Sequence, residues 1–137
     1  MKMNSLTNCR MLFVDDEEFF LNSLLKHMRR RNLCATAAPS GQAGLDWFKN
    51  NPVDVVILDI RMPGLNGLEV LREMRAIKGE DFKVIILSGH AHTDIALEAM
   101  RLGANDYLLK PCSVDELLER IDLVYERLLE HRQASSK

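Results

Sequence analysis

The sequence predicts an α/β protein whose parallel sheet is covered by helices on both faces. Short runs that are apolar at consecutive positions alternate with longer segments whose apolar residues recur every three or four positions. Consecutive apolar positions suit strands that are buried on both faces. Strand–helix units repeated along the chain imply parallel strands joined by right-handed crossovers. The 137 residues fit one domain, residues 1–137, with a core over about 10–131 and a frayed tail over 132–137.

Five short segments are predicted as strands. Four are strongly apolar and lie at residues 11–14, 53–58, 84–87 and 107–109. A weaker one, at residues 34–38, falls between the first and the second of these. Each is short enough for a strand and too short for an independent helix.

Five helices are predicted between and after these strands, at residues 17–31, 40–50, 65–78, 93–102 and 113–131. Each carries an apolar stripe of the kind that packs against a sheet. Ser40 is a favourable N-cap for the second helix, and Gly103 suits the end of the fourth. Ser113 and Glu116 form a capping box that begins the fifth.

Composition excludes several classes of protein. The net charge of −2 produces no strong field toward nucleic acid or an anionic membrane. Cys9, Cys34 and Cys112 are odd in number, far apart and without a C-x-x-C motif, which argues against a disulfide framework and a zinc site. The segment before Arg10 lacks the long apolar region of a secretion signal, and no apolar run approaches the roughly 20 residues that cross a bilayer. We therefore expect a cytoplasmic protein that binds neither nucleic acid nor membrane directly.

Polar residues follow four of the five predicted strands. Asp15 and Asp16 follow the first strand, Asp59 the third, Ser88 the fourth and Lys110 the fifth. In sheets of this kind the functional groups lie at the carboxyl ends of the strands. We therefore expect three carboxylates, one hydroxyl and one ammonium group to meet at one edge of the sheet.

Such a group of carboxylates favours a bound cation. Two carboxylates about 5 Å apart repel by roughly 3 kcal/mol at an effective dielectric near 20, so three of them either raise a pKa or bind a positive ion. Mg²⁺, with Mn²⁺ as an alternative, prefers such oxygen ligands. Asp59 can then attack phosphorus to give an acyl phosphate. Lys110 and Ser88 are placed to stabilise the charge on the transferred phosphoryl oxygens.

Four segments carry a family resemblance. Their sequences are V-D-D-E at residues 14–17, L-D-I-R-M-P-G-L-N-G at 58–67, L-S-G-H at 87–90 and Y-L-L-K-P at 107–111. In this the chain resembles, over about residues 10–131, the receiver domain of bacterial two-component response regulators. The resemblance implies a flavodoxin-like (βα)5 three-layer sandwich with strand order 2-1-3-4-5. It also implies a phosphorylation-dependent signalling switch that takes its phosphoryl group from a sensor histidine kinase or a phosphotransfer protein.

The resemblance assigns roles to the acidic residues. Asp59 is the phosphoacceptor, modified to a phosphoaspartate, and also a metal ligand. Asp16 corresponds to the direct metal ligand, Asp15 to a ligand that acts mainly through water, and the backbone carbonyl of Arg61 to the third protein ligand. The Arg61 side chain is expected to tune the phosphoryl lifetime. From the residues alone, the pair Asp15 and Asp16 could instead favour the start of the first helix.

The remaining roles concern phosphate sensing and switching. Lys110 corresponds to the phosphate-sensing lysine, and its bond to the following proline is expected to be cis. Ser88 and Tyr107 correspond to a switch pair that changes the face made by the fourth helix, the fifth strand and the fifth helix. A static core aromatic is the alternative for Tyr107. His90 is expected to tune water access, because it lies near the mouth of the pocket.

Three other functions fit less well. A phosphatase of the haloacid-dehalogenase type uses a nucleophilic aspartate but needs a second one two residues later, where this chain has Arg61. A dinucleotide-binding module needs G-x-G-x-x-G after the first strand, where acidic residues stand instead. A receiver-like domain that is never phosphorylated would not need the complete set of site residues. The chain is thus expected to catalyse only its own phosphorylation and autodephosphorylation, and to be no enzyme otherwise.

The route of the output stays open between two alternatives. The polar residues 133–137 favour a stand-alone receiver that signals by binding a partner protein, and a phosphorylation-dependent homodimer is a variant of this. The other alternative is a receiver cut from a longer regulator with a DNA-binding or enzymatic output. The fifth helix is long enough to continue into a linker or to pair with a second copy.

Overall fold

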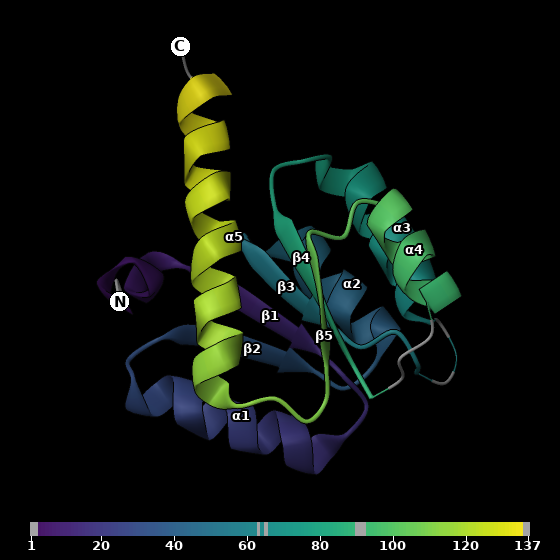
Figure 1. Ribbon diagram of the computed structural model, residues 1–137, viewed down its shortest axis with the longest axis horizontal. Coiled ribbons are helices and arrows are strands. Elements are labelled where there is room, and N and C mark those ends of the chain that lie inside the picture. The colour runs from purple at the N-terminus through teal and green to yellow at the C-terminus, as the bar shows by residue number, and fades with distance from the viewer. Residues whose placement is uncertain (1–2, 63, 65, 90–92, 136–137) are drawn as a thin grey trace.

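Five parallel strands form the central sheet, in the order β2-β1-β3-β4-β5 that the resemblance implied. The computed structural model describes residues 3–62, 64, 66–89 and 93–135 (Figure 1). The strands are β1 (Arg10–Val14), β2 (Cys34–Ala38), β3 (Val55–Leu58), β4 (Lys83–Ser88) and β5 (Asp106–Leu109). The three central strands are almost wholly buried, as their uninterrupted apolar runs predicted.

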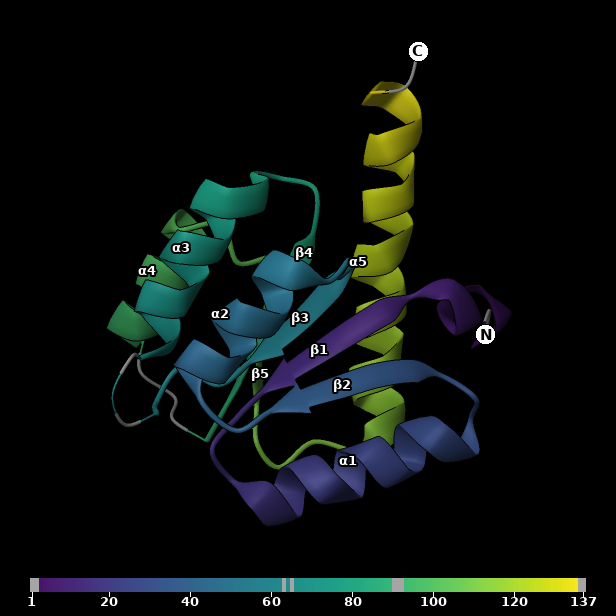
Figure 2. The ribbon, with the colours of Figure 1, turned by 180° about the vertical axis from the view of Figure 1, so that it is seen from behind.

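Helices cover both faces of the sheet and complete a three-layer sandwich, as Figures 1 and 2 show. Helices α1 (Glu18–Arg30) and α5 (Val114–Ser135) pack on one face. Helices α2 (Gly41–Asn50), α3 (Gly67–Lys78) and α4 (Thr93–Arg101) pack on the other. The predicted caps are present, because the Ser40 hydroxyl accepts from the Ala43 N–H and the Ser113 hydroxyl from the Glu116 N–H.

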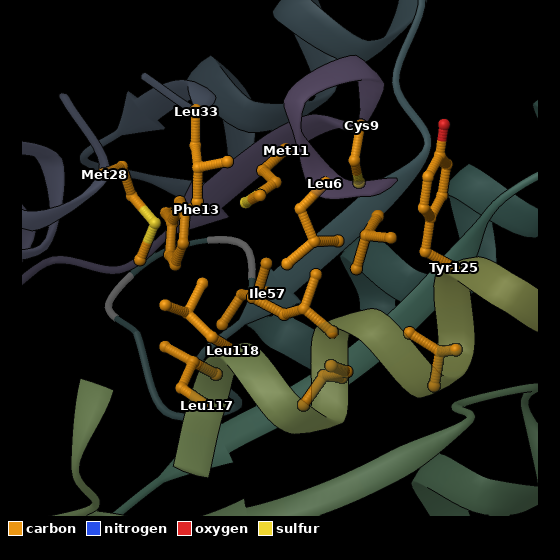
Figure 3. Close-up of a cluster of buried hydrophobic side chains, with 14 of the residues drawn as sticks. Leu6, Cys9, Met11, Phe13, Met28, Leu33, Ile57, Leu117, Leu118 and Tyr125 are labelled. Carbon is orange, nitrogen blue, oxygen red and sulfur yellow. The ribbon is translucent and has the colours of Figure 1, made fainter. Parts of the chain in front are cut away.

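The core on the α1–α5 face begins before the first strand, which corrects the predicted start near residue 10. A 3₁₀ helix, η1 (Met3–Asn8), precedes β1 and contacts α5. Leu6 and Cys9 are fully buried there, in the cluster that includes Leu118 and Tyr125 (Figure 3). No pattern in the sequence indicated η1, because so short a segment contains no repeat of apolar positions.

The end of α5 also corrects the sequence prediction. We expected a frayed tail from residue 132, but the helix continues to Ser135. Arg132 holds this last turn, because its guanidinium lies 2.7 Å from the carboxylate of Asp54 and 2.8 Å from that of Asp81. Asp54 is fully buried and also pairs with Arg10 at 2.9 Å. Burial by itself raises the pKa of Asp54, but hydrogen bonds from Arg10 and Arg132 outweigh it and hold the pKa below its usual value.

The other element bounds lie within two residues of the prediction, which is the usual uncertainty of helix and strand ends. Residue 65, where the third helix was predicted to begin, lies outside the described residues. Within the described part of the chain, no helix combines the length and the apolar character that a membrane span requires.

Candidate functional site

The carboxylates of Asp15 and Asp59 lie next to each other because their strands are neighbours. β1 and β3 pair with Val14 opposite Leu58, so the residue after each strand emerges at the same edge of the sheet. The Asp59 N–H donates to the Val14 carbonyl at 2.9 Å, which extends this pairing by one residue. Both carboxylates are buried, with 3% of Asp15 and 6% of Asp59 exposed. The sheet therefore places two acidic groups together out of water.

The start of α3 closes over the backbone of Asp59. Gly67 donates its N–H to the Ile60 carbonyl at 2.9 Å. A Cβ at this position would collide with the Asp59 carbonyl oxygen and the Ile60 Cα. Only glycine permits so close an approach, so Gly67 fixes the helix against the loop that carries Asp59.

Lys110 brings one positive charge to these carboxylates. It follows β5, and its N–H donates to the Ser88 carbonyl at 2.8 Å. Its Nζ lies 2.6 Å from Asp15 Oδ2, 3.4 Å from Glu17 Oε1 and 3.8 Å from Asp59 Oδ2. The peptide bond between Lys110 and Pro111 is cis, as the resemblance implied. The predicted meeting of Asp15, Asp59 and Lys110 is thus present in the structure.

A third carboxylate, which the sequence analysis did not single out, completes the acidic cluster. Oxygen atoms of Asp15, Glu17 and Asp59 lie within 4.8 Å of one another. Asp15 Oδ1 accepts from the Glu17 N–H at 3.0 Å, and this turn directs Glu17 back to the site. Asp16 is exposed and its carboxylate lies outside the cluster. The tendency of aspartate to bond the backbone N–H two residues later was the signal that could have indicated Glu17.

The electrostatics show that Lys110 does not fully compensate this cluster. Burial, and then the charge of Asp15, raise the pKa of Asp59 to about 6, although Lys110 and the Arg61 N–H oppose the rise. Burial of Lys110 disfavours its charge, but the hydrogen bond and charge of Asp15, with Asp59 and Glu17, raise its pKa overall. A group of carboxylates with one ammonium and an elevated pKa fits a hard divalent cation with oxygen ligands.

The structure also shows where three of the other predicted residues, Ser88, Tyr107 and Arg61, lie. Ser88 is fully buried at the end of β4, on the same sheet edge. Tyr107 is half-buried in β5 and packs against the core of the α2–α4 face. It pairs with Ile86, two residues before Ser88. Arg61 follows Asp59 with an exposed side chain, and His90 lies outside the residues that the structure describes.

Comparison with known proteins identifies the family to which this architecture corresponds. Residues 11–122 match the family model of the response regulator receiver domain. The response regulator MprA of Mycobacterium sp. (strain KMS) is 35% identical over 118 residues, which are 86% of this chain and 51% of that protein. The regulatory protein AtoC of Escherichia coli (strain K12) is 36% identical over 121 residues, which are 88% of this chain and 25% of that protein.

A solved structure shows the same fold. The CheY-like response regulator receiver domain protein of Methanospirillum hungatei JF-1 superimposes with a TM-score of 0.86 at 24% identity, over 90% of this chain and 98% of the other. This likeness supports the fold alone. The chain spans about half the length of MprA and a quarter of the length of AtoC.

Proposed function

The chain belongs to the response regulator receiver domain family of two-component systems, and on this premise we propose that Asp59 accepts the phosphoryl group. One observation carries this assignment. Asp59 is a buried carboxylate whose pKa is raised to about 6, and it lies beside a second buried carboxylate, Asp15, and 3.8 Å from the ammonium group of Lys110. Perturbed acidic groups of this kind are typical of reactive sites.

The donor that fits this site is a phosphohistidine on a sensor histidine kinase or a phosphotransfer protein. An oxygen of ionised Asp59 attacks phosphorus, and the new P–O bond forms as the P–N bond breaks. The electron pair of the broken bond leaves with the imidazole nitrogen. Lys110, whose Nζ lies 3.8 Å from Asp59 Oδ2, would stabilise one phosphoryl oxygen, and the hydroxyl of Ser88, at the end of β4, would stabilise another. Hydrolysis of the acyl phosphate would later return Asp59 to its free form.

The acidic cluster is the proposed site of Mg²⁺, with Mn²⁺ as an alternative. When bound, this ion would neutralise the carboxylates and the incoming phosphoryl oxygens. Asp15, Glu17 and Asp59 offer oxygen atoms within 4.8 Å of one another. Asp16 stays a proposed ligand, because it is exposed next to Asp15 and its charge acts on Asp59. We keep the Arg61 carbonyl as a further proposed ligand.

The proposed signalling surface is the face made by α4, β5 and α5. Ser88 and Tyr107 lie on the two neighbouring strands that connect the site to this face. Five large apolar side chains on these elements are exposed, namely Leu97, Met100, Leu109, Leu123 and Leu129. Exposed apolar groups suit a protein partner, an attached output domain or a second copy of the chain. MprA and AtoC are longer than the matched region, which supports an output domain.

We propose a cytoplasmic location for the protein. We also propose that Arg61 and His90 help to set the lifetime of the phosphoryl group on Asp59.

Mass spectrometry after incubation with acetyl phosphate and Mg²⁺ tests the assignment. We expect the intact protein to gain the mass of one phosphoryl group, and Asp59→Asn to gain none. Asp46→Asn is a matched control, because Asp46 is an exposed carboxylate on α2, away from the site. Equal phosphorylation of Asp59→Asn and the native protein would place the acceptor elsewhere.

A further inference from the structure

A second polar cavity lies at the opposite edge of the sheet from Asp59. Its volume is about 370 Å³, and its lining includes Arg75 at the end of α3, Lys83 at the start of β4 and Arg101 at the end of α4. In Figure 1 the α3–β4 and α4–β5 connections that surround it lie at the edge where the strands begin. We call this space the base cavity. A volume of this order suits a small ligand.

Arg75 brings a fixed positive charge to the base cavity. Its guanidinium donates to the carbonyls of Gly79 at 2.8 Å and Phe82 at 3.0 Å, to that of Gly103, and to Asn105 Oδ1 at 3.1 Å. It also lies 4.3 Å from the centre of the Phe82 ring. All these partners are neutral, and within the described ranges no carboxylate forms an ion pair with Arg75. The structure therefore holds this cation in place without an ion pair, and the charge of Glu80 offsets it only from a distance.

Gly103 makes room for this arrangement. Its φ of +102° is a backbone conformation that favours glycine. A Cβ there would lie 2.6 Å from Arg75 Nε, so a larger residue would displace the guanidinium. The turn before β5 thus depends on glycine for its backbone conformation and for the space that Arg75 occupies.

Two further cations line the cavity with little compensation. Lys83 is half-buried, and none of the carboxylates in the part of the chain that the structure describes forms an ion pair with it. Burial, and then the charge of Arg75, lower the pKa of Lys83, although the charge of Glu80 partly opposes this. Among the carboxylates that the structure describes, Arg101 pairs with Glu98 alone, at 3.7 Å, and its side chain is 78% exposed. Glu80 is the acidic residue of the lining.

We propose that the base cavity binds a small phosphate-bearing anion, with Arg75, Lys83 and Arg101 as its cationic lining. A concave surface with an excess of one charge concentrates ions of the opposite charge. Guanidinium and ammonium groups are the usual partners of phosphate oxygens. An anion with several negative charges matches the excess of positive charge in the cavity better than a single carboxylate does. This site is separate from Asp59, because β4 enters the sheet at Lys83 and leaves it at Ser88.

Titration of the native protein with pyrophosphate, followed by amide NMR, tests the proposal. A chelator and low salt are used, so that no metal recruits the anion to the acidic cluster and screening stays small. We expect saturable shifts at the amides of Lys83, Gly103 and Asn105. We expect Lys83→Gln and Arg101→Gln each to raise the dissociation constant for pyrophosphate about tenfold, as for loss of a charge-assisted hydrogen bond. Lys49→Gln, an exposed lysine on α2, should leave it unchanged.

Several results would overturn the proposal. One is the absence of saturable shifts in a native protein. Another is equal weakening in Lys49→Gln and Lys83→Gln, which would show a response to net charge alone. Shifts confined to the basic run at residues 29–31 would place the anion elsewhere. A glutamate-rich peptide that shifts the same amides at lower concentration than pyrophosphate would show a surface for acidic proteins instead. Arg101→Gln keeps the test valid if Lys83→Gln fails to fold, because Arg101 is largely exposed.

Discussion

Replacing Asp59 by Asn should stabilise the metal-free protein at neutral pH. The folded-state pKa of Asp59 is raised from 3.8 to about 6, chiefly by burial and the charge of Asp15. The ionised carboxylate therefore opposes folding above about pH 6. That cost decreases as the pH falls through 6 and is absent below about 3.8, where both folded and unfolded chains are protonated. Asn has nearly the same shape and carries no charge, so it removes the cost at every pH.

The magnitude follows from the size of the pKa change. A rise from 3.8 to about 6, at about 1.36 kcal/mol for each pKa unit, corresponds to about 3 kcal/mol at pH 7.5. The Asp59 side chain is only 7% exposed, so solvent screening reduces this little. For a domain of this size, about 3 kcal/mol raises Tm by about 10 °C.

Urea unfolding in a chelator, at pH 7.5 and at pH 4, measures this effect. We expect Asp59→Asn to be more stable than the native protein at pH 7.5 and to lose most of that advantage at pH 4. Added Mg²⁺ should stabilise the native protein more than the variant, because it binds the folded carboxylates. Asp46→Asn is the control and should behave as the native protein at both pH values. Equal stability of Asp59→Asn and native protein at pH 7.5, or an advantage that does not change with pH, would refute the reasoning.

Three further perturbations test other contacts. Glu17→Gln should weaken Mg²⁺ binding several-fold in calorimetric titration, because Glu17 is part of the acidic cluster. Glu18→Gln is the control and should leave Mg²⁺ binding unchanged. Equal Mg²⁺ affinities of the two variants would show that Glu17 is not part of the metal site. Arg132→Ala should cost about 1–2 kcal/mol in urea unfolding, since it leaves a fully buried carboxylate with one cation less. Arg127→Ala, exposed on the same helix, is its control, and equal losses would contradict the anchoring role. Gly67→Ala should destabilise the fold by about 2 kcal/mol or more, because the new Cβ would collide with backbone atoms. An unchanged urea midpoint would show that the loop carrying Asp59 can move to accommodate the methyl group.

The Asp54 carboxylate gives the opposite pH dependence to Asp59. Its folded-state pKa is lowered, because hydrogen bonds from Arg10 and Arg132 outweigh the effect of burial. The stability it contributes is therefore complete above its ordinary value of 3.8 and is lost as the pH falls through its lower folded-state pKa. The two buried aspartates act in different pH ranges, so acid unfolding should separate them.

Local pattern was enough to predict most of the fold. Apolar runs and helical periodicity identified the five strands and five helices to within two residues, apart from the end of α5. Strand order came from the family resemblance, since periodicity alone does not determine which strands pair. The 3₁₀ helix at Met3–Asn8 escaped prediction, because it is too short to show a period and is placed by the contact of Leu6 with the core.

The candidate site was likewise predictable only in part from the sequence. The sequence placed Asp15, Asp59 and Lys110 at strand ends, and parallel strands necessarily bring such ends to one edge. The tertiary structure decided that Glu17 joins Asp59 in the cluster while Asp16 is exposed, although the local turn at Asp15 could have indicated Glu17. That outcome depends on the turn after β1 and on the position of Lys110, which is 93 residues from Glu17.

Longer-range contacts explain what no pattern in the sequence could show. Arg132 continues α5 because it meets Asp54, 78 residues earlier in the chain. Arg75 becomes a fixed cation because carbonyls from two separate turns converge on it, one of them 28 residues away. Such contacts depend on where the folded chain brings distant residues together, whereas helix and strand signals depend on neighbours along the sequence. The elements and the chemistry of the strand ends were therefore predictable, and the partners of individual charged side chains were not.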